Sequence, residues 1–297
     1  MKRIKIPYER RKALAGLLFV APWLLGFMMF FFVPFIQSQS YSFHRLDMTA
    51  SGFEMSFIGL ENYRYNLLRD ANFPRYLMEV LGSVLYQVPL VTFFSIFIAM
   101  LLNRKIRGRA AFRAIFFLPV IVASGVVLVF LKEDIFGQSM NASANVYLFK
   151  STGFSAFLTQ LGMPNGIVTA LSGFIDRIFS LTWQSGVQIL LFLAGLQTVP
   201  ASYKEAAHLE GANEWDIFWK VTIPLISPII LLNIIYSIID TFTAFDNKVM
   251  QYIYTTGFVE VNYGSSAAQS WIFFLLIAAL LALVYRFLGR RVSYIVH

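Results

Sequence analysis

Six apolar runs of about 20 residues dominate this 297-residue sequence, and a run of that length is what an α-helix needs to cross a bilayer. The composition agrees, because 58% of the residues are hydrophobic and only 13% are charged, about half the charged share of a globular domain. The sequence therefore predicts an all-α membrane protein. Its spans are expected at residues 13–36, 78–102, 112–131, 174–196, 225–243 and 266–289.

The first span follows the basic segment MKRIKIPYERRK. Its apolar run is longer than the core of a signal peptide, and no small-x-small cleavage site follows it, so we interpret it as a retained helix. No internal repeat, low-complexity tract or soluble domain interrupts the spans. We therefore expect residues 1–297 to form a single transmembrane domain of a multi-pass protein in the cell membrane.

The basic residues between the spans predict the orientation, because cytoplasmic loops carry an excess of Lys and Arg. Segments 1–12 and 103–113 hold six and five basic residues, and NRKIRGRAAFR contains no acid. The long loop 37–77 balances four basic residues with four acidic ones, and loop 132–173 holds two basic residues. Both termini and loop 200–224 are therefore expected in the cytoplasm, and loops 37–77 and 132–173 outside. Short helices are expected near 61–70 and 154–161.

The motifs of common enzymes are missing from the sequence. There is no Cys, the three His are scattered, and neither GxxxxGKS/T, HExxH nor GxSxG occurs. We therefore expect no enzyme activity, no metal site and no cofactor bound by this chain. The net charge of +8 lies in the loops between spans, which argues against nucleic-acid binding.

A polar, helix-prone stretch, EAAHLEGANEWDIFWKVTIP, lies between the fourth and fifth spans. Residues 203–209 are good helix formers, Ser202 and Glu205 have the spacing of a capping box, and Gly211 predicts a helix end. A second amphipathic segment follows, and Pro224 begins the next span. By periodicity alone this stretch is either an interfacial connector or a docking element on the cytoplasmic face.

The same stretch resembles the EAA loop of the permease subunits of ABC importers, in which EAA is followed by three residues, a Gly, nine residues and I-x-L-P. The matching positions are Glu205, Ala206, Ala207, Gly211 and Pro224. FIGLENY (57–63) and NRKIRGRAAFRAIFFLP (103–119) resemble two further segments of carbohydrate-type permeases. The chain departs from the family in a longer loop 132–173 and in the absence of a Gly-Gly-Pro turn after the fifth span.

This resemblance implies a six-helix permease of the type I importer fold. It also implies two cytoplasmic ATPase subunits that bind ATP and Mg²⁺, a second homologous permease in a heterodimer, and an extracytoplasmic solute-binding protein. The EAA loop of such a permease forms a coupling helix that docks on an ATPase subunit. The resemblance further implies a carbohydrate or another polyhydroxylated solute as substrate.

In such permeases the helices on either side of the EAA loop line the substrate path. Polar residues inside a span are costly and usually face a cavity or another helix. The candidates are Trp183, Gln184, Gln188, Asn233, Tyr236, Asp240 and Thr243. The last four repeat at helical spacing on one face, and they either line the path or bond between helices. The alternative function is a secondary transporter driven by an ion gradient. A charged residue inside a span is expected for such a transporter, and Asp240 is the candidate for it in this sequence.

Overall fold

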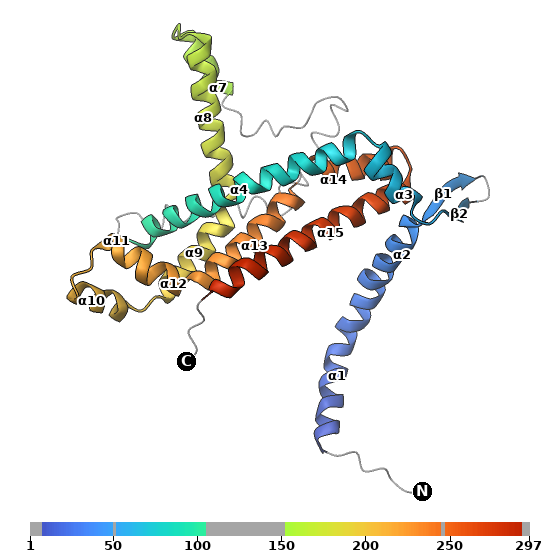
Figure 1. The fold of residues 1–297 in the computed structure, drawn as a ribbon, viewed down its shortest axis with the longest axis horizontal. Helices are drawn as coiled ribbons and strands as arrows, with labels where there is room; N and C mark the ends of the chain where they lie inside the picture. The colour runs from blue at the N-terminus through green and yellow to red at the C-terminus, as the bar shows by residue number, and fades with distance from the viewer. Residues whose placement is uncertain (1–7, 50–51, 105–151, 245–246, 293–297) are drawn as a thin grey trace. The chain divides into compact units, whose positions relative to one another are not determined.

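The computed structural model describes residues 8–49, 52–104, 152–244 and 247–292 (Figure 1). Helices account for nearly all of these residues, as expected for a chain whose backbone must satisfy its own hydrogen bonds in lipid. The predicted third span, 112–131, lies outside the described residues. So does the first half of the predicted outer loop 132–173.

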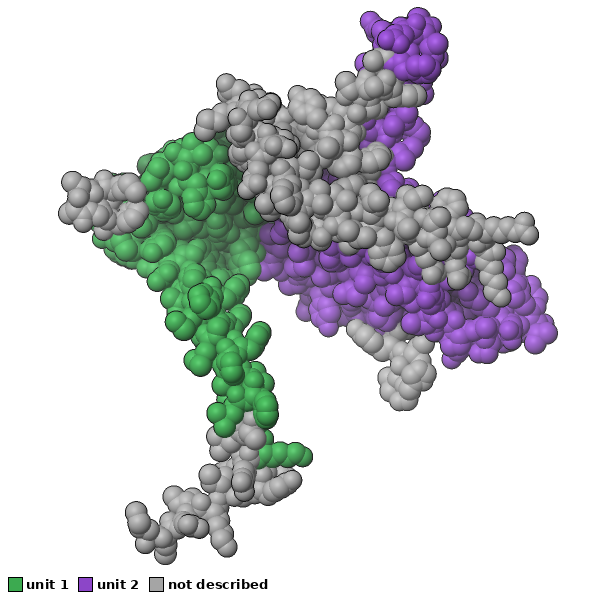
Figure 2. All heavy atoms as spheres, turned by 180° about the vertical axis from the view of Figure 1, so that it is seen from behind, with its two compact units in different colours: residues 1–79, 248–276 green, residues 80–247, 277–297 purple. Residues whose placement is uncertain are grey.

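The chain divides into two compact units, which Figure 2 colours separately. The first unit combines residues 1–79 with 248–276, and the second combines residues 80–247 with 277–297. Each unit is therefore built from segments far apart in the sequence. The single transmembrane domain expected above stays a prediction.

A continuous helical segment begins the first unit, where the first span was predicted. It consists of α1 (Tyr8–Phe27), the π-helical turn η1 (Met28–Phe32) and α2 (Val33–Ser42). Four aromatic side chains at i, i+4 spacing stack along it, with ring centroids 5.0–6.0 Å apart: Trp23, Phe27, Phe31 and Phe35. Most apolar side chains of this segment are exposed, which suits a helix that faces lipid.

A β-hairpin follows, which the all-helical expectation did not include. Strand β1 (His44–Thr49) pairs antiparallel with β2 (Gly52–Phe57), and His44 lies opposite Phe57. The predicted short helix near 61–70 is confirmed as α3 (Glu61–Arg64) with the π-helical turn η2 (Tyr65–Arg69). The prediction missed the hairpin because it was based on long apolar runs that indicate helices. Such runs carry no information on the pairing of two short strands.

Helix α15 (Tyr263–Leu288) joins this segment through a buried polar contact. The Asn66 amide donates to the carbonyl of Ser265 at 3.1 Å, and its oxygen accepts from the Ser265 hydroxyl at 2.9 Å and from Gln269 at 3.0 Å. Asn66 is fully buried, so these bonds offset the cost of removing its amide from water. They fix the start of α15 against η2.

Two further contacts hold α14 (Lys248–Tyr254), which continues into the π-helical turn η5 (Thr255–Val259). The Lys248 ammonium lies 2.6 Å from the Glu79 carboxylate, and the Tyr252 hydroxyl donates to Asp70 at 2.8 Å. Burial raises the pKa of Tyr252, and the hydrogen bond to Asp70 raises it further. Tyr252 therefore stays protonated and keeps donating at any physiological pH.

The core of the second unit lies where three helices meet: α4 (Asn72–Asn103), α9 (Gly186–Thr198) and α13 (Ser227–Thr243). Ile96 and Ala99 of α4 pack with Phe192 of α9 and with Ile226, which precedes α13. Gly195 brings the backbones of α9 and α13 close together, because a Cβ there would lie 2.9 Å from the Ile229 side chain. Small residues permit such close helix packing in membrane proteins.

Two further helices precede α9 in the chain, α7 (Thr152–Gln160) and α8 (Asn165–Gln184). Helix α7 confirms the short helix predicted near 154–161. The predicted span 174–196 is not one helix, since it breaks at Ser185 between α8 and α9. Three helical segments in the described residues are long and apolar enough to cross a membrane: 16–42, 72–103 and 263–288. Counting each of two bent helix pairs as one span raises that number to five.

The start of α15 yields a stability prediction. A Cβ at Gly264 would lie 2.3 Å from the carbonyl oxygen of His44, so the Gly264→Ala variant must shift the backbone. Overpacking of this kind costs about 1–3 kcal/mol, and we expect a lower thermal midpoint of unfolding for the purified variant. Gly82→Ala in α4 is the matched control, because nothing lies within 4 Å of that position. Equal midpoints for the two variants would contradict this close packing.

Candidate functional site

The polar stretch between α9 and α13 contains α10 (Ala201–Leu209), which projects beyond the ends of both helices in Figure 1. Pro200 caps α10, with ψ of 138°, so the helix begins immediately after it. The predicted Ser202 cap is therefore wrong, because Ser202 already lies in the first helical turn. The axes of α9 and α10 differ by 65°, which directs α10 away from α9.

The end of α10 is set by Gly211, as predicted. Gly211 has a φ of +84°, a left-handed conformation that L side chains rarely adopt. The Gly211 N–H donates to the carbonyl of His208 at 3.0 Å, and the Ala212 N–H donates to that of Ala207 at 3.0 Å. These two bonds form a Schellman motif. No atom lies within 4 Å of a Cβ built on Gly211, so the backbone conformation, rather than crowding, favours glycine there.

A second helical segment follows the Schellman turn. It consists of α11 (Glu214–Asp216), the π-helical turn η4 (Ile217–Thr222) and α12 (Ile223–Leu225). The Asn213 side chain caps it by accepting from the Asp216 N–H at 2.8 Å. The hydrogen bond from Lys220 to Asp216, at 2.7 Å, lowers the pKa of that carboxyl. Asp216 therefore remains ionised near neutral pH, at a helix start where an acid is favourable.

Apolar side chains attach this second segment to the core. Ile217 is buried, and Phe218 packs against the core cluster of the second unit. Pro224 lies within the segment, and the break falls after it at Ile226, so α13 begins at Ser227 rather than at 225. The axes of this segment and α13 differ by 71°. The loop is thus a helix-turn-helix that is bent away from both flanking helices.

The side chains of α10 that match the EAA pattern are available for contact. Glu205 and Ala206 are exposed and Ala207 is half-buried, while Leu209 keeps 90% of its surface exposed. Glu205 forms no ion pair with any side chain in the described ranges. The surface of α10 therefore combines small residues, one unpaired carboxylate and an exposed apolar side chain.

The polar candidates of the second unit form two contacts between helices. Gln87 of α4 donates to Gln184 at the end of α8. The Gln188 amide of α9 donates to the Ser237 hydroxyl of α13 at 3.3 Å, and it also interacts with the Asp240 carboxylate. Gln87 was missed by the sequence reasoning, although a lone amide in an apolar run is a usable signal.

The predicted polar face of α13 changes in burial along its length. Asn233 is fully buried, and neither polar atom of its side chain has a hydrogen-bond partner among the described residues. Tyr236 and Asp240 are half-buried. Thr243 is exposed, and its hydroxyl donates to the Ile239 carbonyl of the same helix at 2.8 Å. The side chain of Trp183 lies outside the description. Tyr236 and Asp240 are therefore the two residues of this face that are both accessible and close to other polar groups.

Residues 177–294, which include the helix-turn-helix and the polar helices around it, match the family "Binding-protein-dependent transport system inner membrane component". The chain is 31% identical to the probable ABC transporter permease protein YesP of Bacillus subtilis (strain 168), over 97% of this chain and 93% of that protein. It is 30% identical to the sn-glycerol-3-phosphate transport system permease protein UgpA of Agrobacterium fabrum (strain C58 / ATCC 33970), over 93% and 95%. These matches define a transport permease.

The fold is also similar to that of a solved structure. A chain in the crystal structure of a bacterial alginate ABC transporter, in complex with an alginate pentasaccharide-bound periplasmic protein, matches with a TM-score of 0.67 at 17% identity. The match covers 96% of both chains. The protein described here belongs to the family of binding-protein-dependent transport system inner membrane components, and it is a permease subunit of an ABC importer.

The accessible polar pair gives a second prediction. If Asp240 binds solute hydroxyls, the Asp240→Asn variant loses a hydrogen bond to a charged group, which is worth about 1.5–3 kcal/mol. Uptake at limiting solute should then fall by about one to two orders of magnitude. Tyr236→Ala should also reduce uptake, while the amount of protein in the membrane stays normal.

Thr241→Val is the matched control for this pair, because among the described residues the Thr241 hydroxyl bonds to its own helix, at the Ser237 carbonyl. Uptake measured with radiolabelled solute should be normal for this variant. Normal uptake by both Asp240→Asn and Tyr236→Ala would instead assign these two side chains to helix packing.

Proposed function

We propose that residues 1–297 form a single permease domain with the type I importer fold and six spans, of which the fourth, 174–196, is broken at Ser185. In this proposal the chain forms half of a translocation path and a second, homologous permease forms the other half. The observation that carries the proposal is the helix-turn-helix between α9 and α13. It combines the EAA pattern with a surface that is exposed and bent away from the spans.

Both termini and loop 200–224 lie in the cytoplasm in this proposal, and the hairpin of β1 and β2 lies outside. The excess of Lys and Arg in segments 1–12 and 103–113 supports this orientation. It brings α10 to the side of the membrane where ATP is available.

Two cytoplasmic ATPase subunits are the proposed partners of α10. They bind ATP and Mg²⁺, whereas this chain holds no cofactor or metal of its own and is not an enzyme. Helix α10 docks through Glu205, Ala206 and Ala207, with Gly211 and Pro224 fixing the turn and the return to the membrane. The small residues allow close approach, and Glu205 pairs with a basic group of the ATPase.

Transport follows from this docking as a rigid-body switch. ATP binding closes the two ATPase subunits, and α10 transmits that closure to α9 and α13. The path then changes from inward-facing to outward-facing, because the closed ATPase dimer binds only one of the two permease conformations. An extracytoplasmic solute-binding protein delivers the solute to the outer loops.

The proposed solute is an oligosaccharide or another polyhydroxylated molecule. The polar side chains of α8, α9 and α13 support this choice, because amides, a carboxylate and a phenol suit hydroxyl groups. The path residues in this proposal are Trp183, Gln184, Gln188, Asn233, Tyr236, Asp240 and Thr243. The relative UgpA is named for sn-glycerol 3-phosphate, which is derived from a polyol. The similar solved structure is that of an alginate transporter, and alginate is polyhydroxylated.

The orientation predicts a labelling pattern. Because the chain has no Cys, single Cys residues can be introduced at two exposed positions, Glu54 of β2 and Glu210 after α10. A membrane-impermeant maleimide applied to intact cells, or to spheroplasts where an outer membrane is present, should label Glu54→Cys. It should label Glu210→Cys only after the cytoplasmic face is opened. The reverse pattern would place α10 on the wrong side for an ATPase.

The coupling role predicts the effect of two substitutions. Glu205→Lys reverses the charge at the docking surface, and loss of a buried, hydrogen-bonded charge partner costs roughly 2–5 kcal/mol. Binding of the ATPase subunits should weaken by about 30-fold to several thousand-fold. Gly211→Val should also uncouple the complex, because a β-branched residue is strained at positive φ. Gly211→Asn should be milder, since Asn tolerates that conformation.

Co-purification of the ATPase subunits and solute-stimulated ATP hydrolysis are the measurements, with membrane abundance as the reference. Glu54→Lys is the control for charge reversal on an exposed carboxylate. Gly162→Val is the control for strain, because Gly162 has a φ of +74°, also with open space around it. The proposal fails if Glu205→Lys and Gly211→Val match their controls in both measurements.

A further inference from the structure

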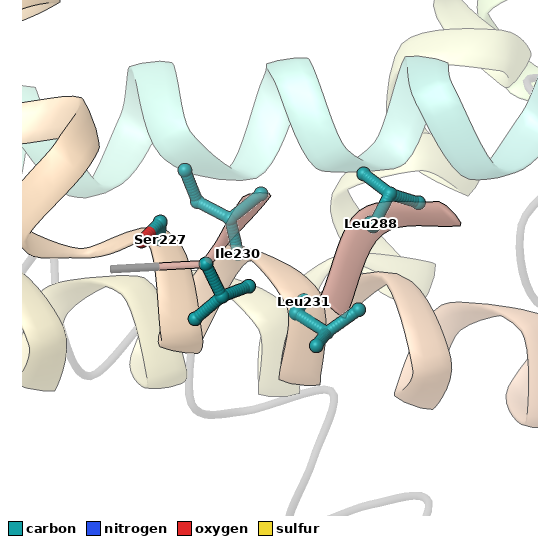
Figure 3. Close-up of a pocket in the computed structure, with 5 residues that line it drawn as sticks. Ser227, Ile230, Leu231 and Leu288 are labelled. Atoms are coloured by element: carbon teal, nitrogen blue, oxygen red, sulfur yellow. The ribbon is translucent and has the colours of Figure 1, made fainter. Parts of the chain in front are cut away.

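A narrow apolar slot lies where the first turns of α13 meet the end of α15 (Figure 3). It has a volume of about 180 Å³ and is lined by Ser227, Ile230, Leu231, Leu288 and Val292. Figure 3 shows aliphatic side chains on both helices around it. Pockets for whole small molecules are usually about 300–1,000 Å³, so this slot admits a hydrocarbon chain rather than a complete solute.

A basic hollow adjoins the slot along the chain. It has a volume of about 360 Å³ and is lined by Tyr285, Arg286, Gly289 and Arg290. Leu288 of the slot and Gly289 of the hollow are neighbours in sequence, at the start of the 3₁₀ turn η6 (Gly289–Arg291). Both the apolar slot and the cationic hollow are therefore lined by residues at the end of α15, a helix long and apolar enough to cross a membrane.

The charges of the hollow are unbalanced. Arg286 and Arg290 are both exposed, and neither forms an ion pair with any carboxylate in the part of the chain that the structure describes. The sequence from 278 to 297 contains no Asp or Glu at all. Two guanidinium groups four residues apart lie on one face of the chain, and guanidinium binds phosphate oxygens in a bidentate manner.

We propose that this end of α15 binds an anionic phospholipid. One acyl chain occupies the slot between Ile230, Leu231 and Leu288, and Arg286 and Arg290 hold the phosphate. Basic pockets between membrane helices bind anionic head groups in this way. The amphipathic ring of Tyr285 suits the boundary between the two regions. Binding itself does not depend on the importer function, whereas its assignment to the cytoplasmic leaflet rests on the proposed orientation.

An acidic surface of another protein would also complement two arginines. The slot favours a lipid, because four of the five residues that line it have aliphatic side chains, which suit an acyl chain and not an acidic protein surface. A phospholipid joins an apolar chain and a phosphate in one molecule, which matches an aliphatic lining next in the chain to a basic one.

The test is a lipid titration of the purified full-length chain, followed by native mass spectrometry. Dioleoyl phosphatidylglycerol is the anionic probe and dioleoyl phosphatidylcholine the zwitterionic one. Each Lys or Arg near a membrane surface contributes about 1 kcal/mol, which is roughly fivefold in affinity. The double variant Arg286→Gln/Arg290→Gln should therefore bind phosphatidylglycerol about 20- to 30-fold more weakly, with phosphatidylcholine binding unchanged.

Two further variants separate the parts of the site. Ile230→Trp fills the slot and should weaken the binding of both lipids. Arg104→Gln removes an exposed arginine at the end of α4 and should leave both unchanged. The proposal is overturned if Arg104→Gln weakens phosphatidylglycerol binding as much as the double variant does. It is also overturned if Ile230→Trp has no effect, or if soluble glycerol phosphate competes as effectively as the intact lipid.

Discussion

A hydrocarbon core offers no hydrogen-bond partner to a peptide group, and this constraint explains why the described chain is almost wholly helical. It also explains how the few polar side chains of the spans are arranged. Gln87 pairs with Gln184 and Gln188 contacts Ser237 across helix boundaries, whereas the buried Asn233 amide has no hydrogen-bond partner among the described residues. Asp240 and Tyr236 remain half-buried beside them. In the proposed function, these two side chains bind a polyhydroxylated solute that passes between the helices.

The helix-turn-helix between α9 and α13 is shaped by its local backbone conformation. The bend of 65° before α10 and the bend of 71° before α13 separate the helix-turn-helix from both neighbours. The Schellman turn at Gly211 satisfies the carbonyls of Ala207 and His208, which have no partner within α10 because they lie in its last turn. Ile217 is buried and Phe218 packs against the core cluster, so in the proposed mechanism a displacement of α10 would reach packed helices.

The sequence predicted what depends on local patterns. Apolar runs predicted the positions of the first, second and last spans, because the length of a run can be read directly from the sequence. Gly211 predicted the end of α10, because glycine is the residue that most readily adopts a positive φ. The hairpin of β1 and β2 was missed, although its alternating residues around a short turn were a usable signal. The pairing of Gln87 with Gln184 joins residues 97 positions apart. No local pattern reports such contacts, and the same holds for Gly264 against His44.

In the proposed mechanism, ATP binds to the ATPase subunits, and their closure, transmitted through α10, drives import by this chain. The most direct measurement is uptake into proteoliposomes that contain the chain with its second permease and ATPase subunits, with the binding protein and labelled solute on the outer side. Uptake should require ATP inside the vesicles and should persist when ionophores collapse every ion gradient. Uptake that proceeds without ATP, and stops when an ion gradient is collapsed, would contradict the account and identify a secondary transporter.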